Sequence, residues 1–496
     1  MKFFAALAST VAVALVTSAH AYSTQDSDPI ATDLAPLLSP NARIYVRGDN
    51  STLFDEVTLR YALVKPDISV AISVGAAEDV PVIVKYAYTH SREILAANRR
   101  HGWSKSLDYV KDAIMIDIST LTNITVDAAA NTVTVGGGVR VGDVMPVLQA
   151  VGKETSTGIC DCAGFLGVTL GGGHGRLQGR HGLVVDNILS AHLTIATGET
   201  ITVSNTSNPD LFWALRGAGH NFGIVTEATY RIYDAVNGGM QYTTNAMYDP
   251  VYIPEIFKAM NDFDVPAESN ALLAFFVNPV LGTPQMVMNF VSSAPEADAR
   301  DQFKSAFGHI PYLSRNETMV LWASVNGQGL DGTGDYACRS RARKRIGGVS
   351  TVRYDIQSVL DAYEKYKEFT AKPGAEGSIM LFESYSVKAV QAVERASTAY
   401  PWRDETGVIL LDAVYTDASL DDAANHWLAG TMAILHADSG FPRPAVYMNY
   451  ASGLEGFGAA YGYEKWRQRK LKDLKREWDP RCVFSGYNPI PIDCER

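Results

Sequence analysis

The segment from Gly158 to Asn187, GICDCAGFLGVTLGGGHGRLQGRHGLVVDN, limits the possible folds more than any other part of the chain, because nine of its thirty residues are glycine. Glycine has no Cβ, so such a backbone can approach a flat or charged partner closely with its amides free to donate. A nucleotide pyrophosphate is the natural candidate. The generic dinucleotide fingerprint and the Walker pattern are both absent. A glycine-rich scaffold without a ligand is the alternative.

The bulk composition is that of a globular protein with two or three domains. The chain has 496 residues, 47% of them hydrophobic and 20% charged. The formal net charge of −11 argues against a nucleic-acid partner, because phosphate binding needs clustered basic surface.

The first 21 residues have the pattern of a secretory signal. Lys2 supplies the positive end, an apolar run follows, and an Ala-x-Ala cleavage pattern ends at Ala21. A membrane anchor is the alternative, but the run is short and no other stretch is long enough to span a bilayer. Asn-x-Ser/Thr sequons compatible with glycosylation on export begin at Asn50, Asn123, Asn205 and Asn316. We predict a secreted protein without a membrane partner.

Helices and strands alternate from about residue 66 to 233, too irregularly for a simple doubly wound sheet. Apolar periodicity predicts helices at 76–90, 140–152 and 208–219, and strands at 113–119, 132–138, 189–204 (as a hairpin) and 221–233. Longer helices and strands follow from about 234 to 443. The segment 463–480 is a basic amphipathic helix whose charges are interpreted as a solvated face.

The roles of a basic turn and of the cysteines are not decided by these patterns. Arg99, Arg100 and His101 stand together on a turn, which we expect directly after the apolar helix at 76–90; a solvated basic loop is the simpler interpretation. Five cysteines leave at least one thiol unpaired or otherwise engaged.

The order of the motifs is more specific than any one of them. RRHGWS, AIMIDIST, GICDCAGFLGVTLGGGHG, GLVVDN, NPDLFWALRGAGHNFGIVT, YMNYASG and WDPRCVFSGYNPI follow one another along the chain. In this order the chain resembles the flavoprotein oxidases of the vanillyl-alcohol oxidase superfamily, in the berberine-bridge-enzyme-like group. The resemblance runs from about residue 66 to the end.

The resemblance implies an α+β fold with FAD as cofactor. A two-lobed PCMH-type FAD-binding domain is expected at 66–233, after a signal peptide at 1–21 and a leader at 22–65. A substrate-binding domain at 234–443, with an antiparallel sheet and flanking helices, would form the roof over the flavin. The segment 444–496 would return to the FAD domain.

The same resemblance assigns covalent flavin attachment. His101 occupies the position of the histidine that bonds the 8α-methyl of FAD, although Arg99 and Arg100 replace the family's two glycines. Cys160 is in register with the cysteine that bonds flavin C6 in bicovalent members; a lowered thiol pKa would be required. Cys162 is interpreted as a packing residue or an unreactive thiol.

Other residues of these motifs are expected to contact the cofactor. They are Asn98, Arg99, Arg100, Gly102, Trp103, Gly158, Ala163, Gly164, Gly167, Gly172, Gly173, Gly223 and Ile224. Ala163 is smaller than the family's Val or Leu, which favours oxygen access and hence an oxidase. No metal site is predicted.

Tyr450 matches the family's catalytic tyrosine and is the predicted base. A free tyrosine has a pKa near 10, so Tyr450 needs a neighbouring cation or a second residue that shares its proton. Tyr447 alternates with it along an apparent strand and is interpreted as support. Glu383 lines the cavity or, more simply, is an edge-strand carboxylate.

The predicted function is therefore an FAD-linked oxidase that acts on a small-molecule alcohol and O2, with H2O2 as product. A catalytically idle flavin-binding protein is one alternative, and a dehydrogenase or oxidative cyclase of secondary metabolism is another. The family's substrates include sugars, aromatic alcohols, alkaloids, polyketides and terpenoids, and no motif in 234–443 selects among them.

Overall fold

The computed structural model describes residues 28–48, 52–332, 338 and 342–495. The predicted signal segment and the sequon at Asn50 lie outside these ranges. The other three sequon side chains, Asn123, Asn205 and Asn316, are exposed. In the part of the chain that the structure describes, no helix is both long and apolar enough to cross a membrane.

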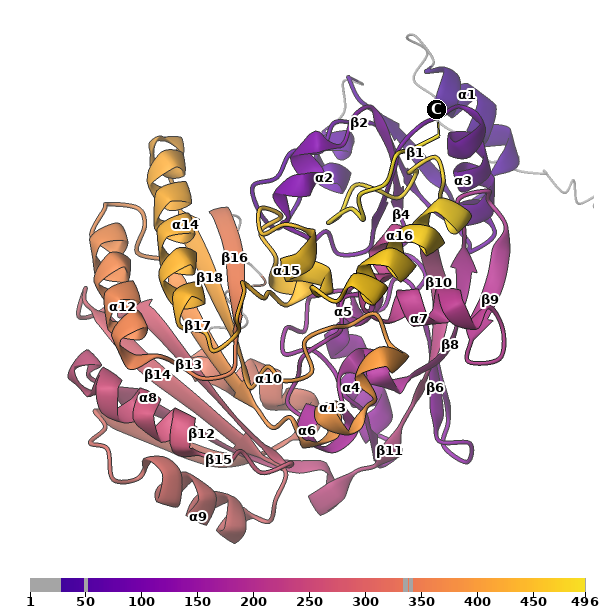
Figure 1. Cartoon of the computed structure of the whole chain (residues 1–496). Helices are drawn as coiled ribbons and strands as arrows, with labels where there is room; N and C mark the ends of the chain where they lie inside the picture. Colours follow the sequence, from indigo (N-terminus) through magenta and orange to yellow (C-terminus); the bar gives the residue numbers. More distant parts are fainter. Residues whose placement is uncertain (1–27, 49–51, 333–337, 339–341, 496) are drawn as a thin grey trace, which may run out of the picture.

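The first lobe is a four-stranded sheet in the order β1-β2-β4-β3 (Figure 1). Its strands are β1 (Arg43–Val46), β2 (Ile68–Ser73), β4 (Ala113–Asp117) and β3 (Ile94–Ala97), and its helices are α1 (Pro29–Leu34), α2 (Leu53–Thr58) and α3 (Asp79–Thr89). The helix predicted at 76–90 is confirmed as α3, whose apolar residues recur at helical spacing and are buried. Strand β1 pairs antiparallel with β2, so the leader at 22–65 contributes an edge strand.

The second lobe is an antiparallel five-stranded sheet in the order β5-β6-β10-β8-β9. Its strands are β5 (Ile124–Asp127), β6 (Thr132–Gly136), β10 (Ile224–Arg231), β8 (Ile188–Thr194) and β9 (Thr200–Ser204). Its helices are α4 (Val141–Gln149), α5 (Phe165–Leu170), α6 (Gln178–His181) and α7 (Pro209–Ala218). The predicted hairpin is confirmed as β8 and β9, which turn at Gly198 with a φ of +84°. A short pair, β7 (Lys153–Glu154) and β11 (Tyr233–Asp234), lies beside it.

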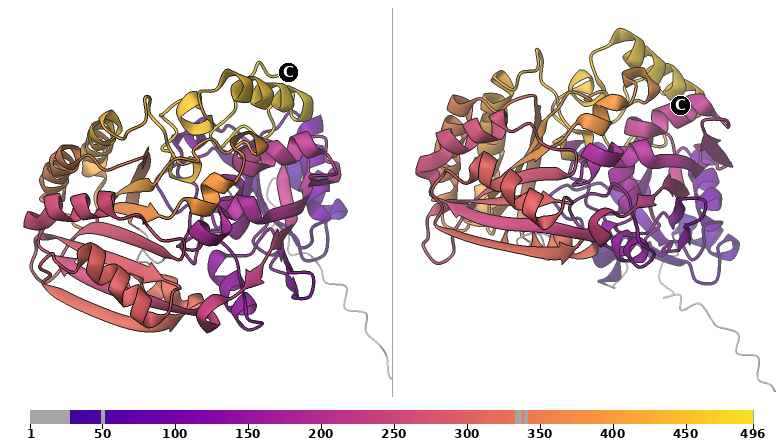
Figure 2. Two further views of the ribbon diagram at one scale, coloured as in Figure 1. Left: turned by 60° about the horizontal axis from the view of Figure 1, so that its bottom comes forward. Right: turned by 90° about the horizontal axis from the view of Figure 1, so that it is seen from below.

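The third unit is a seven-stranded antiparallel sheet in the order β15-β12-β14-β13-β17-β18-β16. The strands are β12 (Met240–Tyr248), β13 (Ser269–Val277), β14 (Pro284–Ser292), β15 (Ser314–Leu321), β16 (Arg343–Thr351), β17 (Ile379–Tyr385) and β18 (Gly407–Tyr415). Helices α8 (Ile253–Asp262), α9 (Glu296–Phe307), α12 (Ile356–Thr370) and α14 (Asp421–Ala437) cover its outer face, and its inner face turns toward the two lobes (Figures 1 and 2). The expected α+β class is confirmed.

The C-terminal segment returns to the first two lobes. Helices α15 (Phe457–Tyr461) and α16 (Lys465–Trp478) are yellow in Figure 1, and α16 packs against α7. The interpretation of the α16 charges as a solvated face is wrong for two of them. Arg467 and Lys475 are fully buried, because their charged groups bond to backbone carbonyls and acidic side chains of neighbouring segments.

Candidate active site

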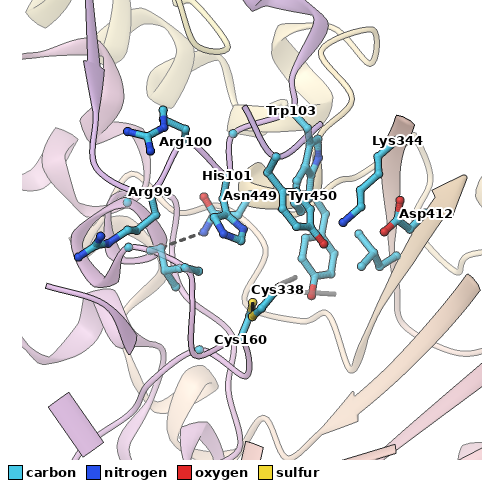
Figure 3. Close-up of a pocket in the computed structure, with 18 of the residues that line it drawn as sticks. Arg99, Arg100, His101, Trp103, Cys160, Cys338, Lys344, Asp412, Asn449 and Tyr450 are labelled. Carbon is cyan, nitrogen blue, oxygen red and sulfur yellow. Dashed lines mark hydrogen bonds between the residues drawn. The ribbon is translucent and has the colours of Figure 1, made fainter. Parts of the chain in front are cut away.

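One cavity of about 890 Å3 lies between the two lobes and the inner face of the seven-stranded sheet (Figure 3). Its walls include the loop after β3, the glycine-rich loop before α5, the loop before β10 and the C-terminal residues Phe484 to Tyr487. The sheet contributes side chains of β13, β16, β17 and β18. This volume is in the range of small-molecule and cofactor sites.

The basic turn borders this cavity but does not follow a helix. A buried strand, β3, directly precedes it because Ile94 to Ala97 pair with β4. Arg100 has a φ of +57°, the left-handed region that glycine adopts without strain. Its Nε donates to the carbonyl of Leu59 at 3.1 Å. The turn therefore keeps a glycine-like backbone, and its guanidinium is already committed to the protein.

His101 presents a neutral imidazole to the cavity. Its ring stacks on Tyr61, with centroids 4.4 Å apart, and Lys344 Nζ lies 3.6 Å from the Tyr61 centroid. Burial, followed by the charges of Lys344 and neighbouring arginines, lowers the pKa of His101 to about 4. The ring nitrogen lone pair is thus available near neutral pH.

Three sulfur atoms meet beside His101. Cys162 and Cys338 form a disulfide, and Cys160 is the free cysteine that the odd count predicts. Cys160 Sγ lies 3.4 Å from Cys162 Sγ and 3.8 Å from Cys338 Sγ. One ligand atom each of His101, Cys160 and Cys162 falls within 4.8 Å. A disulfide sulfur is no thiolate, so we assign no metal to this group.

One expectation about these cysteines was wrong, and one requirement for attack by Cys160 is not met in the cavity as it stands. Cys162 is neither a packing residue alone nor a thiol, because it is bonded to Cys338. The thiol pKa of Cys160 is raised rather than lowered, since burial outweighs the backbone amides of Cys162 and Ala163 that favour the thiolate. The second disulfide, Cys482–Cys494, closes the C-terminus.

Most of the predicted cofactor-contact residues line the cavity. They are Asn98, Arg99, Arg100, Gly102, Trp103, Gly158, Ala163, Gly164, Gly167, Gly223 and Ile224. Gly172 and Gly173 do not reach it. They have φ values of +121° and +85°, and an added Cβ would lie 2.6 Å from the Tyr400 ring and 2.5 Å from Val184 Cβ. Glycine is required at these two positions by the protein's own packing, which corrects their assignment to the cofactor.

The cavity wall holds polar atoms that are suited to FAD. Arg60 Nε and Nη1, Asn98 Oδ1, Arg99 Nε and Trp103 Nε1 are buried and have no hydrogen-bond partner among the described residues. Buried polar groups are nearly always bonded, so these atoms are available to a bound polar molecule. Most are donors, as phosphate and flavin carbonyl oxygens require. Arg60 was missed because no motif marks it; burial lowers its pKa to about 10, which leaves it cationic.

Tyr450 and Glu383 form the second half of the site. Tyr450 ends a 3-10 helix (Met448–Tyr450) rather than lying on a strand as we expected, and its Oη donates to Glu383 Oε1 at 2.6 Å. Glu383 is not on an edge strand, because β17 lies between β13 and β18. Tyr385 Oη donates to the other carboxylate oxygen. Burial raises the pKa of Glu383, and burial with the Glu383 charge raises that of Tyr450.

Tyr447 has the supporting role that we predicted. It is buried, and its Oη accepts the backbone amides of Gly173 at 3.1 Å and His174 at 3.3 Å. It therefore joins the Tyr450 segment to the glycine-rich loop.

Lys344 on β16 and Asp412 on β18 also face the cavity, and sequence reasoning missed both (Figure 3). Both are at least 95% buried. Burial raises the pKa of Asp412 to about 7, against the opposing effect of Lys344. The signal for Asp412 is a single charge inside the apolar strand GVILLDAVY, whereas Lys344 lies between Arg343 and Arg345 and nothing in the sequence distinguishes it from them.

Comparison with known proteins gives consistent results. Residues 68–204 match a family model described as an FAD binding domain. The FAD-linked oxidoreductase anuG of Penicillium roqueforti is 33% identical over 471 residues, 93% of this chain and 92% of that protein. The FAD-linked oxidoreductase srdI of Neurospora crassa is 30% identical over 98% of this chain and 97% of its own length.

Solved structures share the fold at lower identity. The BBE-like 1 protein of Physcomitrella patens has a TM-score of 0.81 at 20% identity, over 94% of this chain and 100% of that one. A xylooligosaccharide oxidase from Myceliophthora thermophila has a TM-score of 0.79 at 20% identity, over 94% and 99%. Glucooligosaccharide oxidase from Acremonium strictum, with a 6-S-cysteinyl, 8α-N1-histidyl FAD, has a TM-score of 0.80 at 20% identity, over 94% and 100%.

Proposed function

Because the chain belongs to the FAD-linked oxidoreductases, we propose that it is a secreted oxidase of an alcohol or a similar C–H donor. The observation that carries this proposal is that Tyr450 lines the same cavity as His101 and Cys160 and donates a hydrogen bond to the buried Glu383 behind it. Bound FAD supplies the hydride acceptor and the reaction with O2 that yields H2O2.

The cofactor would be held by the atoms that the protein leaves unbonded. Arg60 and Arg99 would donate to phosphate oxygens, and Asn98 and Trp103 would bond to other polar groups. We propose His101 and Cys160 as covalent attachment sites. The neutral state of His101, the proximity of its ring to the Cys160 sulfur and the doubly linked FAD of glucooligosaccharide oxidase support this assignment.

The substrate hydroxyl proton would pass through Tyr450 to Glu383. The Glu383 carboxylate disfavours a tyrosinate, so Tyr450 is not a base that waits in its ionised form. Instead its own proton already points to Glu383 Oε1, 2.6 Å away. Tyr450 can accept the substrate proton as it releases its own, and the raised pKa of Glu383 makes that carboxylate a better acceptor.

Two features favour an active oxidase over the alternatives. Ala163 is small and borders the cavity, which supports oxygen access and disfavours a dehydrogenase. Arg100 keeps the left-handed turn of the glycine that it replaces, which disfavours an idle protein whose cofactor turn has drifted.

The proposal includes export and the domain division. The signal pattern at 1–21 and the exposed Asn123, Asn205 and Asn316 support secretion with glycosylation. We propose an FAD domain at 66–233, completed by 444–496 and joined by the leader through β1, and a substrate domain at 234–443, with a small molecule and O2 as partners.

Anaerobic rapid mixing with a panel of alcohols, sugars and phenols tests this function through the flavin absorbance. Tyr450→Phe and Glu383→Gln should each slow flavin reduction by about 10²–10⁴-fold, because each removes one position of the proton path. FAD content should stay unchanged, and the exposed Tyr109→Phe should behave as wild type. If the flavin of Tyr450→Phe is reduced at the wild-type rate, Tyr450 is not part of the proton path. Reduced flavin that persists in air would make the protein a dehydrogenase.

A further inference from the structure

The inner face of the seven-stranded sheet presents an almost entirely apolar wall to the cavity. Its lining side chains include Leu272, Phe276, Ile379, Leu381, Leu410 and Val414. The strand registers place Leu381 opposite Leu410 and Ile379 opposite Asp412, so these side chains form one continuous surface. A substrate on this wall would bury its surface against hydrocarbon.

Asp412 is the exception within this surface. Its side chain is buried, and Oδ1 has no hydrogen-bond partner among the described residues. Other polar groups of the wall are already bonded: Ser378 Oγ with Val414 and Asn278 Oδ1 with the amides of Val280 and Leu281. A buried acceptor without a partner is costly, and a bound ligand that donates a hydrogen bond would remove that cost.

Lys344 lies beside this carboxyl group. The two residues come from adjacent strands, since Ile346 is the neighbour of Asp412 in the β16–β18 register. Figure 3 shows Lys344 near Asp412, the Lys344 ammonium lies over the Tyr61 ring, and its charge lowers the Asp412 pKa against the effect of burial. The pair therefore offers a ligand one carboxyl acceptor with a cation nearby.

The distance between Asp412 and the Tyr450 end of the cavity sets the length of the ligand. Glu383, which binds Tyr450, lies opposite Val408, four residues along β18 from Asp412. At 3.3–3.4 Å per residue the two carboxyl groups are separated by about 13 Å of strand. Leu381 and Leu410 lie between them.

A sugar chain is a poor match for this arrangement. Each sugar ring carries several hydroxyl groups, and each one that is buried without a partner costs free energy. Between Glu383 and Asp412 the wall offers those groups only Leu381 and Leu410. A flat apolar body with one hydroxyl at its far end matches both the hydrocarbon and the single acceptor.

We propose that the substrate is an apolar fused-ring molecule whose distal hydroxyl group bonds to Asp412 while its reacting end lies at Tyr450, and that oligosaccharides are not substrates. This proposal rests on the proposed function, because it places the reacting end at the Tyr450–Glu383 pair. It assigns Asp412 as the residue that selects for the hydroxyl group and the apolar wall as the surface that selects for the ring system.

Equilibrium binding to the flavin-loaded protein tests the proposal, with the change in the flavin spectrum as readout. The probes are 2-naphthol, 2-methoxynaphthalene and cellobiose. The two naphthalenes have no alcohol C–H bond to oxidise, so their dissociation constants are measured without turnover. We expect 2-naphthol to bind about 10-fold or more tightly than 2-methoxynaphthalene, because only 2-naphthol donates to Asp412. Cellobiose should bind weakest of the three.

Variants of Asp412 test whether this residue causes the preference for 2-naphthol over 2-methoxynaphthalene. Asp412→Leu should abolish the preference for 2-naphthol and leave the affinity for 2-methoxynaphthalene within about threefold, because the wall is unchanged. Asp412→Asn keeps an acceptor oxygen and should retain part of the preference. Equal binding of the two naphthalenes to wild type, no binding of either, tighter binding of cellobiose, or full discrimination in Asp412→Leu would each overturn the proposal. Failure of the proposed function would show itself separately, as absence of flavin reduction by any alcohol.

Discussion

The state of the His101 ring follows from its neighbours. Tyr61 covers one face of the imidazole, Lys344 lies beyond Tyr61, and Arg60 and Arg100 add positive charge nearby. A protonated ring in this position would be both desolvated and repelled, so the neutral ring is favoured. The same residues that surround the cofactor site therefore keep its proposed attachment residue nucleophilic.

Covalent attachment at His101 predicts flavin that survives loss of the fold. Acid-denatured wild type should keep its yellow flavin, because a carbon–nitrogen bond does not depend on tertiary structure. His101→Ala should keep its flavin only if Cys160 also bonds it, and the double variant with Cys160→Ala should release it. His220→Ala is the matched control, since this cavity-lining histidine also has a pKa lowered to about 4 by burial. Release of all flavin from denatured wild type would refute the linkage.

The three-sulfur contact makes a separate prediction for Cys162→Ala. This change frees Cys338, whose sulfur already lies 3.8 Å from Cys160. In the oxidising secretory compartment that the proposed export implies, where O2-driven thiol oxidation accepts the two electrons, we expect a new Cys160–Cys338 disulfide, which would remove Cys160 from the flavin. Non-reducing peptide mapping should find flavin on both residues in wild type and on His101 alone in the variant. Cys482→Ala opens the other disulfide and should leave the flavin peptides unchanged. Flavin on Cys160 with a free Cys338 thiol in Cys162→Ala would contradict this prediction.

Helix α16 links the C-terminal segment to the lobes through a buried charge. Lys475 Nζ donates to Asp479 Oδ2 at 2.6 Å and to the carbonyls of Asn221 at 2.8 Å and Phe484 at 3.1 Å. Asp479 in turn accepts the backbone amide of Phe484. The C-terminal end of α16 is thus held in the interior by the Lys475–Asp479 ion pair.

Removal of that cation should destabilise the protein strongly. Lys475→Met leaves Asp479 charged and buried, and loss of one partner of a buried pair typically costs about 3–5 kcal/mol. Thermal unfolding should show a large fall in Tm. Lys465→Met in the same helix removes an exposed lysine and should change Tm little. Equal Tm values for the two variants would show that the buried pair does not stabilise the C-terminal segment.

The stability of the whole molecule should depend on the ionisation of Asp412. Its pKa rises from an ordinary value of 3.8 to about 7 in the folded chain because burial disfavours the charge. Between these two pKa values the carboxyl group of the unfolded chain ionises while that of the folded chain stays protonated. The folded state is therefore favoured most at low pH, and this advantage is lost as the pH rises to the pKa of the folded chain. The separation of the two pKa values corresponds to about 4 kcal/mol, lost progressively between about pH 4 and pH 7.

Asp412→Asn removes this dependence, because the amide does not ionise. The Tm of the variant should exceed that of wild type at pH 8, and the difference should shrink toward pH 5. Asp210→Asn, at an exposed aspartate, should follow wild type across the range. A constant difference between Asp412→Asn and wild type from pH 5 to pH 8 would show that Asp412 does not titrate in this window.

The fold class, the FAD cofactor, the placement of His101, Cys160 and Tyr450 at one cavity, and helices α3, α4 and α7 with strands β4, β6, β8, β9 and β10 could be predicted from the amino-acid sequence, whereas β3 before the basic turn could not. Helical and strand periodicity is local, and motifs that follow one another in a set order carry the cofactor site with them. Gly172 and Gly173 show the limit of that reasoning. A glycine pattern reports a close approach of the backbone but not which atoms approach it.

Only the tertiary structure identified Arg60, Lys344 and Asp412 as members of the site, and only it showed that Glu383 accepts a hydrogen bond from Tyr450. These residues come from the leader and from three strands of the seven-stranded sheet, and none belongs to a motif. Their role depends on which atoms remain unbonded after packing, and on strand registers that bring together residues far apart in the chain. Burial then changes the pKa of each. Periodicity can predict neither the unbonded atoms nor the changes in pKa, because both arise from contacts between segments that are far apart in the chain.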